Sequence, residues 1–428
     1  MCTRAPSVLS SHCEHVPDWF SVPIVEDDIV SCKTEKVEEI ESVSMFGSIA
    51  NLFKNIVATS MLTMPYGVSC AGVVPSILIG IIFALLSSFT FAELGRLCAL
   101  AKVTTYRGIC EKYISKKFGV YVEVLLAMYT FPSCISYSIF LISCFERMAS
   151  HLIPEDSVWA LFRTRWLIGL LLTVLVLLPL CSISKLHVLT YTSILGIAAT
   201  IYCFIFVAVD LGASDVDIAA NIAGAIWGPP SGSLLGIFPM ANIYASLYLV
   251  HYNAPKFCAD LIRPTRIRVA TMAGSAMGLA GLFCCAFSLL GFARWGVGVL
   301  DNILMEYTGA YIVWVATCVS IITTYPFVFD AGRRSLISIF GKSEKKIFWT
   351  STFVLVPLFS IIAVFVNNLA LIVGLNGAIA GMTVGFSLPG FLMVRRARLE
   401  KESCPIGWGL VSIGIALSVL GVASIFIL

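Results

Sequence analysis

Long apolar runs dominate the chain from residue 45 onward. They recur with lengths of about 17 to 25 residues, which is the length that an α-helix needs to cross the hydrocarbon core of a bilayer. Only 12% of the residues are charged, whereas a soluble domain keeps roughly a quarter of its residues charged. Because backbone polar groups in hydrocarbon must be hydrogen-bonded within their own segment, each run is expected to be a helix. The sequence therefore predicts an all-α polytopic membrane protein.

The runs predict eleven transmembrane helices. They are placed at 45–69, 73–94, 119–145, 166–182, 186–209, 232–253, 268–291, 309–330, 347–366, 368–394 and 406–427. The division near residue 367 rests on length alone, because residues 356–392 are almost continuously apolar.

Residues 1–44 differ in composition from the rest of the chain. They are polar, with acidic clusters at 26–28 and 35–41, and a charge excess with low hydrophobicity is typical of disorder. We expect a disordered acidic tail that lies in the cytoplasm. In that orientation the cytoplasmic loops carry 20 Lys and Arg residues and the opposite loops carry four, as the positive-inside rule requires.

The membrane of residence stays open at this stage. An odd number of spans leaves the C-terminal end outside the cell or in a lumen. No cleavable signal peptide is recognisable, the outside loops carry no glycosylation sequon, and the tail has no acidic dileucine motif. A plasma membrane and a vacuolar or lysosomal membrane are therefore both compatible with the sequence.

The first span, residues 45–69, is too polar to face lipid. Asn51, Lys54 and Asn55 lie in its first half, a run of small residues lies near its middle, and Pro65 follows. Each polar group left without a hydrogen-bond partner in hydrocarbon costs a free energy on the order of several kcal/mol. This span is predicted to be a discontinuous helix that lines a solute site.

Two further spans share this polar character. The sixth carries Asn242, Tyr244, Ser246, Tyr248, His251, Asn253 and Pro255. The eighth carries Ser320, Thr323, Thr324, Pro326 and Asp330. The two interrupted spans, the first and the sixth, are five apart, which is the pattern of transporters built from two inverted five-helix repeats. The predicted repeats are 45–209 and 232–394, followed by an eleventh helix at 406–427.

Simpler interpretations exist for single residues. Polar side chains also join helices by hydrogen bonds. Lys54 either extends to the headgroups or pairs with a carboxylate inside the bundle. His251 either carries a coupling proton, because its pKa lies near physiological pH, or is a neutral structural residue.

Several classes of function find no support. The net charge of +3 is too small to indicate a nucleic-acid partner. The candidate metal cluster His12, Cys13 and His15 lacks a second ligand pair, so neither a metal nor a cofactor is expected. No nucleophile–base set lies within the membrane, which argues against an enzyme. Of the 15 cysteines, only Cys70, next to the end of the first span, falls in an outside loop, so an extracytoplasmic disulfide is not expected.

Four segments in order resemble one family. Residues 52–72 (LFKNIVATSMLTMPYGVSCAG) resemble the first helix of the amino acid/auxin permeases, closest to their proton-coupled amino acid transporter branch. Residues 247–268, 291–304 and 323–336 resemble the sixth helix with its loop, the end of the seventh helix and the eighth helix. The resemblance covers the chain from residue 45 onward.

This resemblance implies a leucine-transporter-like fold of two inverted five-helix repeats plus one helix. It also implies secondary active transport of an amino acid, driven by a proton or sodium gradient. The substrate-binding residues are expected to be Asn55, Val57, Ala58, Thr59, Ser60, Ser246, Tyr248 and His251. The ion-coupling residues are expected to be Lys54, Asn55, Thr323, Thr324 and His251.

The first span departs from the family pattern at two positions. Ala58-Thr59-Ser60 stands where the family has Gly-x-Gly, which narrows the pocket and favours a small or polar substrate. Lys54 stands where sodium-coupled members carry an Asn. Because an ammonium group can replace the cation, proton coupling or exchange is favoured over sodium coupling. Three alternatives remain: a sodium-coupled neutral amino acid transporter, a non-transporting sensor that signals through residues 1–44, and a channel, for which no repeated filter is present.

Overall fold

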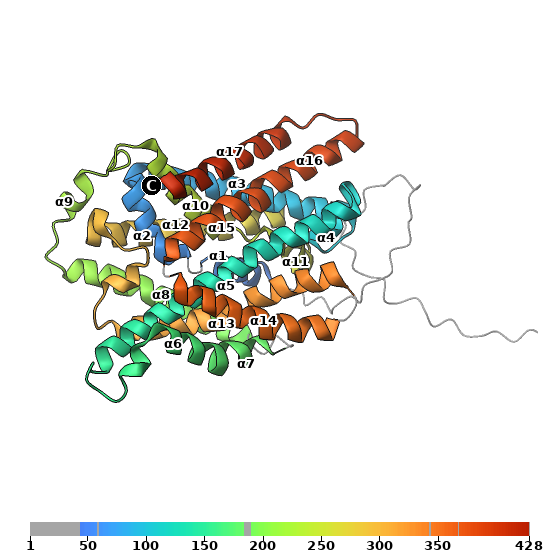
Figure 1. Cartoon of the computed structure of the whole chain (residues 1–428). Helices are drawn as coiled ribbons and strands as arrows, with labels where there is room; N and C mark the ends of the chain where they lie inside the picture. Colours follow the sequence, from blue (N-terminus) through green and yellow to red (C-terminus); the bar gives the residue numbers. More distant parts are fainter. Residues whose placement is uncertain (1–42, 58–59, 184–189, 342–343, 367, 428) are drawn as a thin grey trace, which may run out of the picture.

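The computed structural model describes residues 43–427 except for 58–59, 184–189, 342–343 and 367. Every regular element in this part of the chain is a helix (Figure 1). The tail predicted at 1–44 lies outside it except for its last two residues. The Val43 N–H donates to the Asp260 carbonyl at 2.7 Å, and the Val43 carbonyl accepts from the Ile262 N–H at 3.0 Å. Ser44 caps the first helix.

The helices of the first half correspond to the first five predicted spans, except for α4 and α9, which lie between predicted spans. They are α1 (Met45–Ile56), α2 (Ser60–Ala71), α3 (Val73–Ala101), α4 (Tyr106–Tyr113), α5 (Lys116–Leu152), α6 (Arg165–Leu172), α7 (Leu178–Cys181), α8 (Thr190–Ala213) and α9 (Ile218–Ala223). A π-helical turn, η3 (Thr173–Leu177), joins α6 to α7.

The helices of the second half follow the remaining predictions. They are α10 (Ile237–Leu247), α11 (Ala254–Asp260), α12 (Arg266–Trp295), α13 (Tyr311–Phe340), α14 (Glu344–Phe365), α15 (Leu369–Asn376), α16 (Leu388–Leu399) and α17 (Pro405–Ile427). A 3₁₀ turn, η6 (His251–Asn253), precedes α11, and two π-helical turns, η9 (Gly377–Gly381) and η10 (Thr383–Ser387), connect α15 to α16.

Nine helical stretches of the described residues are long and apolar enough to cross a membrane. Each overlaps one predicted span. The other two predicted spans are present as shorter pieces. Residues 45–69 form α1 and α2, with 12 residues each, and 166–182 corresponds to the shorter apolar stretch Arg165–Cys181. An all-helical membrane protein is therefore confirmed, whereas the count of eleven is not.

Side-chain caps define where several long helices begin. The Ser115 hydroxyl accepts the Phe118 N–H at 3.2 Å at the start of α5, and the Thr265 hydroxyl accepts the Arg268 N–H at 3.3 Å at the start of α12. Such caps satisfy a backbone donor that has no partner inside the helix. The division near residue 367, expected from length alone, separates α14 from α15, and the Asn368 side chain caps α15.

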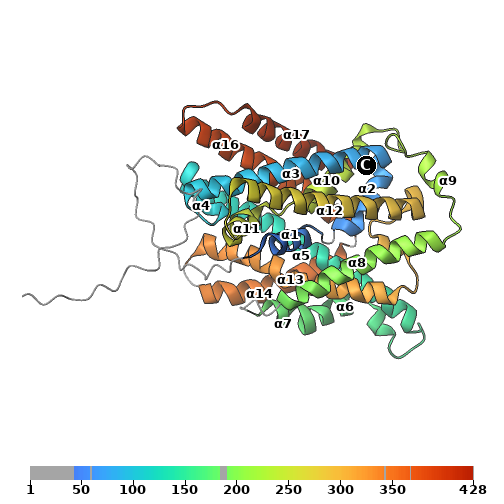
Figure 2. The ribbon, with the colours of Figure 1, turned by 180° about the vertical axis from the view of Figure 1, so that it is seen from behind.

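The interrupted helices lie at the centre of the assembly. α2 and α3 pack against each other and against both α10 and α12, while α13 packs on α5 and α8 (Figures 1 and 2). α10 also lies directly on η9. A Cβ added to Gly377 would fall 1.8 Å from the Asn242 carbonyl oxygen, so only glycine permits this approach. This close approach holds α10, which belongs to the sixth predicted span, against η9, which belongs to the tenth.

Candidate functional site

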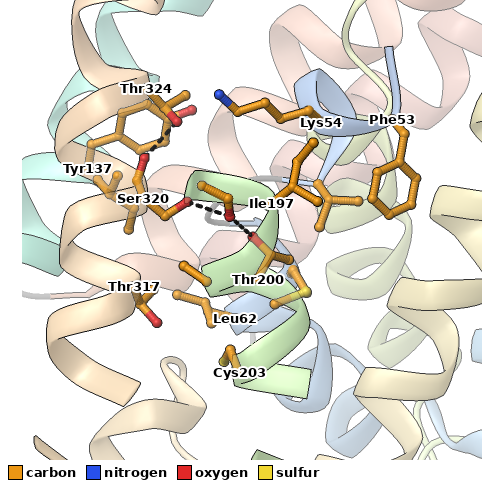
Figure 3. Close-up of a pocket in the computed structure, with 15 residues that line it drawn as sticks. Phe53, Lys54, Leu62, Tyr137, Ile197, Thr200, Cys203, Thr317, Ser320 and Thr324 are labelled. Carbon is orange, nitrogen blue, oxygen red and sulfur yellow. Dashed lines mark hydrogen bonds between the residues drawn. The ribbon is translucent and has the colours of Figure 1, made fainter. Parts of the chain in front are cut away.

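A pocket lies beside the break between α1 and α2 (Figure 3). Its walls come from α1, the start of α2, α5, α8 and α13. The polar lining residues are Lys54, Tyr137, Thr200, Thr317, Ser320 and Thr324. The apolar ones are Phe53, Val57, Met61, Leu62, Ile197, Ala199, Cys203 and Ile321, and Gly196 completes the wall on α8. The pocket thus combines a polar end with an apolar remainder.

The hydroxyl groups of the pocket donate their protons to backbone carbonyls. Thr200 and Ser320 both donate to the Gly196 carbonyl, at 3.0 and 3.2 Å (Figure 3). Thr324 donates to the Ser320 carbonyl at 2.8 Å. Because a hydroxyl has one proton and two lone pairs, these oxygens can only accept any further hydrogen bond. Three acceptors that converge on one space suit a cation rather than an anion.

Lys54 supplies a cation to this space. Its side chain extends from α1 toward Thr324 (Figure 3), and its Nζ lies 3.7 Å from a Cβ built on Gly196. The Phe327 ring lies 6.0 Å from Nζ. Within the described part of the chain, Lys54 has no ion pair and no carboxylate lines the pocket. Of the two predicted roles, the carboxylate partner is thus not observed among these residues.

The two broken helices meet at a pair of serines. The Ser60 hydroxyl, at the start of α2, lies 3.4 Å from the Ser246 hydroxyl near the end of α10. Val57 is buried on the other side of the break. The first turn of α2 offers backbone N–H groups without helical partners. At the end of α10 the Tyr244 and Ser246 carbonyls accept the Tyr248 and Leu249 N–H groups, and each oxygen keeps a second lone pair. Ala58 and Thr59, both predicted substrate ligands, lie outside the described residues.

Ser60 and Ser246 are not among the residues that line the pocket, and four further predicted site residues lie outside it as well. Asn55 is exposed on α1, and its amide donates to the Asn51 carbonyl at 2.8 Å. Tyr248 is buried, and its hydroxyl donates to the Met277 carbonyl on α12 at 3.2 Å. Thr323 donates to the Ser320 carbonyl at 2.9 Å and is not among the lining residues.

His251 is the fourth. It is 1% exposed, and its Nε2 shares a hydrogen bond of 2.9 Å with the Thr90 hydroxyl. The Phe91 ring packs edge-on against the imidazole at 5.9 Å. These contacts join the sixth predicted span to α3. They are the kind of contact expected for a structural histidine, which the sequence offered as the alternative to a carrier of the coupling proton.

The contribution of α8 is absent from the sequence-based site. Gly196, Thr200 and Cys203 line the pocket, but in the sequence they are three scattered residues of an apolar span. The available signal was their spacing, because residues four and seven positions apart share one helix face. Ser320 was recognised as a polar residue of the eighth span but was not assigned to the site.

Comparison with known proteins identifies the family of this chain. The profile of the family described as transmembrane amino acid transporter protein matches residues 41–427. The chain belongs to this family. The Mus musculus protein named solute carrier family 38 member 8 is 21% identical over 419 residues, which cover 89% of this chain and 92% of that protein.

A further relative has a similar sequence, and one solved structure shows the same fold. The Xenopus tropicalis protein named putative sodium-coupled neutral amino acid transporter 8 is 20% identical over 410 residues, covering 89% and 92% of the two chains. The crystal structure of MhsT in complex with L-phenylalanine superposes with a TM-score of 0.60 at 14% identity, covering 91% of this chain and 100% of MhsT. The protein is therefore a multi-pass amino acid transporter with the fold of MhsT, and not an enzyme.

Proposed function

We propose that this transporter moves small neutral amino acids by alternating access, and that the Lys54 ammonium takes the place of a coupling sodium ion. The observation that carries the proposal is the position of Lys54. Its Nζ lies in a pocket of hydroxyl oxygens that can only accept hydrogen bonds, beside the break in the first span. Coupling to protons or to exchange is then preferred over coupling to sodium.

The substrate is proposed to bind where the two broken helices meet. The backbone N–H groups at the start of α2, around Val57 to Ser60, would hold the carboxylate, because a helix N-terminus favours an anion. The carbonyls at the end of α10, with the Ser246 hydroxyl, would hold the ammonium group. The apolar lining, for example Met61, Cys203 and Ile321, suits an uncharged side chain. The word neutral in the name of the Xenopus relative supports the same class.

Sodium coupling is the second candidate, and one observation favours it. Thr200, Ser320 and Thr324 present the oxygen lone pairs that a sodium ion requires. The name of the Xenopus relative contains the word sodium-coupled. Sodium could enter only if the Lys54 side chain withdrew, since two cations cannot share the space. The presence of the Lys54 charge in the pocket therefore distinguishes sodium-independent transport from sodium coupling.

The proposal includes the number of membrane spans and the two groups of spans that move during transport. The interrupted α1–α2 and the Arg165–Cys181 stretch would bring the number of spans to eleven, arranged as repeats at 45–209 and 232–394 with 406–427 as the last span. Spans 1, 2, 6 and 7 would rock against spans 3, 4, 5, 8, 9 and 10. The distribution of basic loops supports a cytoplasmic N-terminus. The protein is proposed to lie in the plasma membrane or in a vacuolar or lysosomal membrane.

Uptake into proteoliposomes tests the proposal. The full chain would be given a panel of radiolabelled amino acids under an imposed proton gradient, a sodium gradient, or an internal load of unlabelled amino acid. We expect uptake of small neutral amino acids that is equal in sodium and choline buffers, and little uptake of lysine or arginine, which Lys54 repels. A strict sodium requirement would contradict the role of Lys54, and no uptake of any amino acid would contradict the proposed substrate.

A further inference from the structure

A second pocket lies outside the transport site, between α3 and α12. Its lining residues belong to the parts of α3 and α12 that lie at the end of the molecule where α4 and α11 are found (Figure 2). Its floor is apolar and is made by Phe89 and Ala92 of α3 with Val269 and Ala270 of α12. Phe89 is 39% exposed, and it continues an exposed apolar stripe of α3. The groove therefore opens sideways, toward the region that lipid occupies around a membrane helix.

Two arginines share one buried carboxylate at the rim of this groove. Glu93 is 7% exposed. Arg96 binds it closely, with Nη2 at 2.7 Å and Nε at 2.8 Å from Oε2. Arg266 approaches the other oxygen only to 3.7 Å and is 74% exposed. The three groups together carry one excess positive charge, and the Arg266 guanidinium keeps donors available. A phosphodiester, with one negative charge and two free oxygens, matches a guanidinium of this kind.

Beyond the groove, α12 presents a smooth exposed surface. Gly274 and Gly278 follow Ala270 at intervals of four residues and so lie on nearly the same stripe of the helix. Both are exposed, and a Cβ added to either would meet nothing within 4 Å. This stripe without side chains extends for about two helical turns, on the order of 11 Å. An extended hydrocarbon chain can lie along such a surface, whereas a soluble anion gains nothing from it.

We propose that the α3–α12 groove binds an anionic phospholipid, with its phosphate on Arg266 and Arg96 and one acyl chain along Ala270, Gly274 and Gly278. The occupant is a lipid and not a free phosphate because the arginines stand beside the apolar residues Phe89, Ala92, Val269 and Ala270 on two membrane helices. Both helices belong to the group proposed to rock during transport, so the lipid would move with that group. This site is separate from the amino acid pocket and does not depend on how transport is coupled.

Photo-crosslinking tests the site in the complete protein. The purified chain would be placed in nanodiscs of phosphatidylcholine that contain a trace of photoactivatable phosphatidylserine, and labelled peptides would be mapped by mass spectrometry. We expect labelling to concentrate on residues 88–96 and 266–278. Arg266→Gln should lower it about tenfold, because a hydrogen bond to a charged group is lost. Arg396→Gln, which removes another basic residue paired with a nearby glutamate, should leave it unchanged.

A second variant tests the proposed contact with the acyl chain without changing any charge. Gly274→Leu places a side chain on the surface proposed for the acyl chain and should also reduce labelling, whereas Gly409→Leu, at an exposed glycine of α17 with equally open surroundings, should not. Even labelling of all lipid-facing helices, or equal labelling by a phosphatidylcholine probe, would identify annular lipid only and overturn the proposal. Loss of labelling on addition of soluble glycerophosphate would overturn the choice of a lipid.

Discussion

Replacing Lys54 by asparagine is expected to convert the transporter from sodium-independent to sodium-stimulated uptake. The variant removes the ammonium and leaves the hydroxyl groups of Thr200, Ser320 and Thr324 on the wall of the pocket. Because their protons bind the Gly196 and Ser320 carbonyls, those oxygens can only accept a further contact. The shorter asparagine adds an amide oxygen on the α1 wall, and a sodium ion no longer meets a competing charge.

The size of the effect follows from the position of the ammonium. Lys54 and these oxygens line the same pocket, so we take a separation of about 4 Å between the charge and a sodium ion bound there. At that distance two like charges repel by about 4 kcal/mol with an effective dielectric constant of 20. This energy corresponds to about a thousandfold in affinity. Removal of the charge should therefore strengthen sodium binding by up to about three orders of magnitude.

The assay is radiolabelled uptake in proteoliposomes as a function of sodium concentration. Lys54→Arg retains the charge and should remain indifferent to sodium. Lys54→Met removes the charge without adding a ligand and should show an intermediate sodium response. The reasoning is refuted if Lys54→Asn transports well but responds to sodium no more than Lys54→Arg, or if the unmodified protein already requires sodium.

Two further predictions concern the packing that supports the site. Arg333 is 1% exposed and binds Asp330, the Cys181 carbonyl at 2.8 Å and the Thr352 hydroxyl at 3.2 Å. Arg333→Met leaves a buried carboxylate short of a partner and should cost about 3–5 kcal/mol of stability, read as a lower Tm in detergent. Arg334→Met removes the exposed partner of the same carboxylate and should cost about 1 kcal/mol or less; equal losses would contradict the burial argument. Gly377→Ala should prevent α10 from reaching η9 and abolish uptake, whereas Gly409→Ala, in open space, should preserve it, and normal uptake by Gly377→Ala would show that α10 does not need this approach.

The sequence alone determined the class of the molecule and the position of its helices. The length of an apolar run and the cost of a bare polar group in hydrocarbon are local properties, so they can be evaluated without a fold. The same cost identified the interruptions of the first and sixth spans, and α1 ends and α2 begins close to the predicted break. Family membership was also readable, because four ordered motifs carry it.

Only the tertiary structure decided which polar residues share one space. Lys54 and Asn55 are neighbours in the sequence, yet one side chain enters the pocket and the other is exposed, since successive residues point about 100° apart around a helix. Tyr248 and His251 resemble ligands in the sequence but are turned toward α12 and α3. Thr200 looks like an ordinary packing residue until α8 brings it beside α13. Helix rotation and the choice of neighbour depend on packing across the whole chain, and no local pattern encodes them.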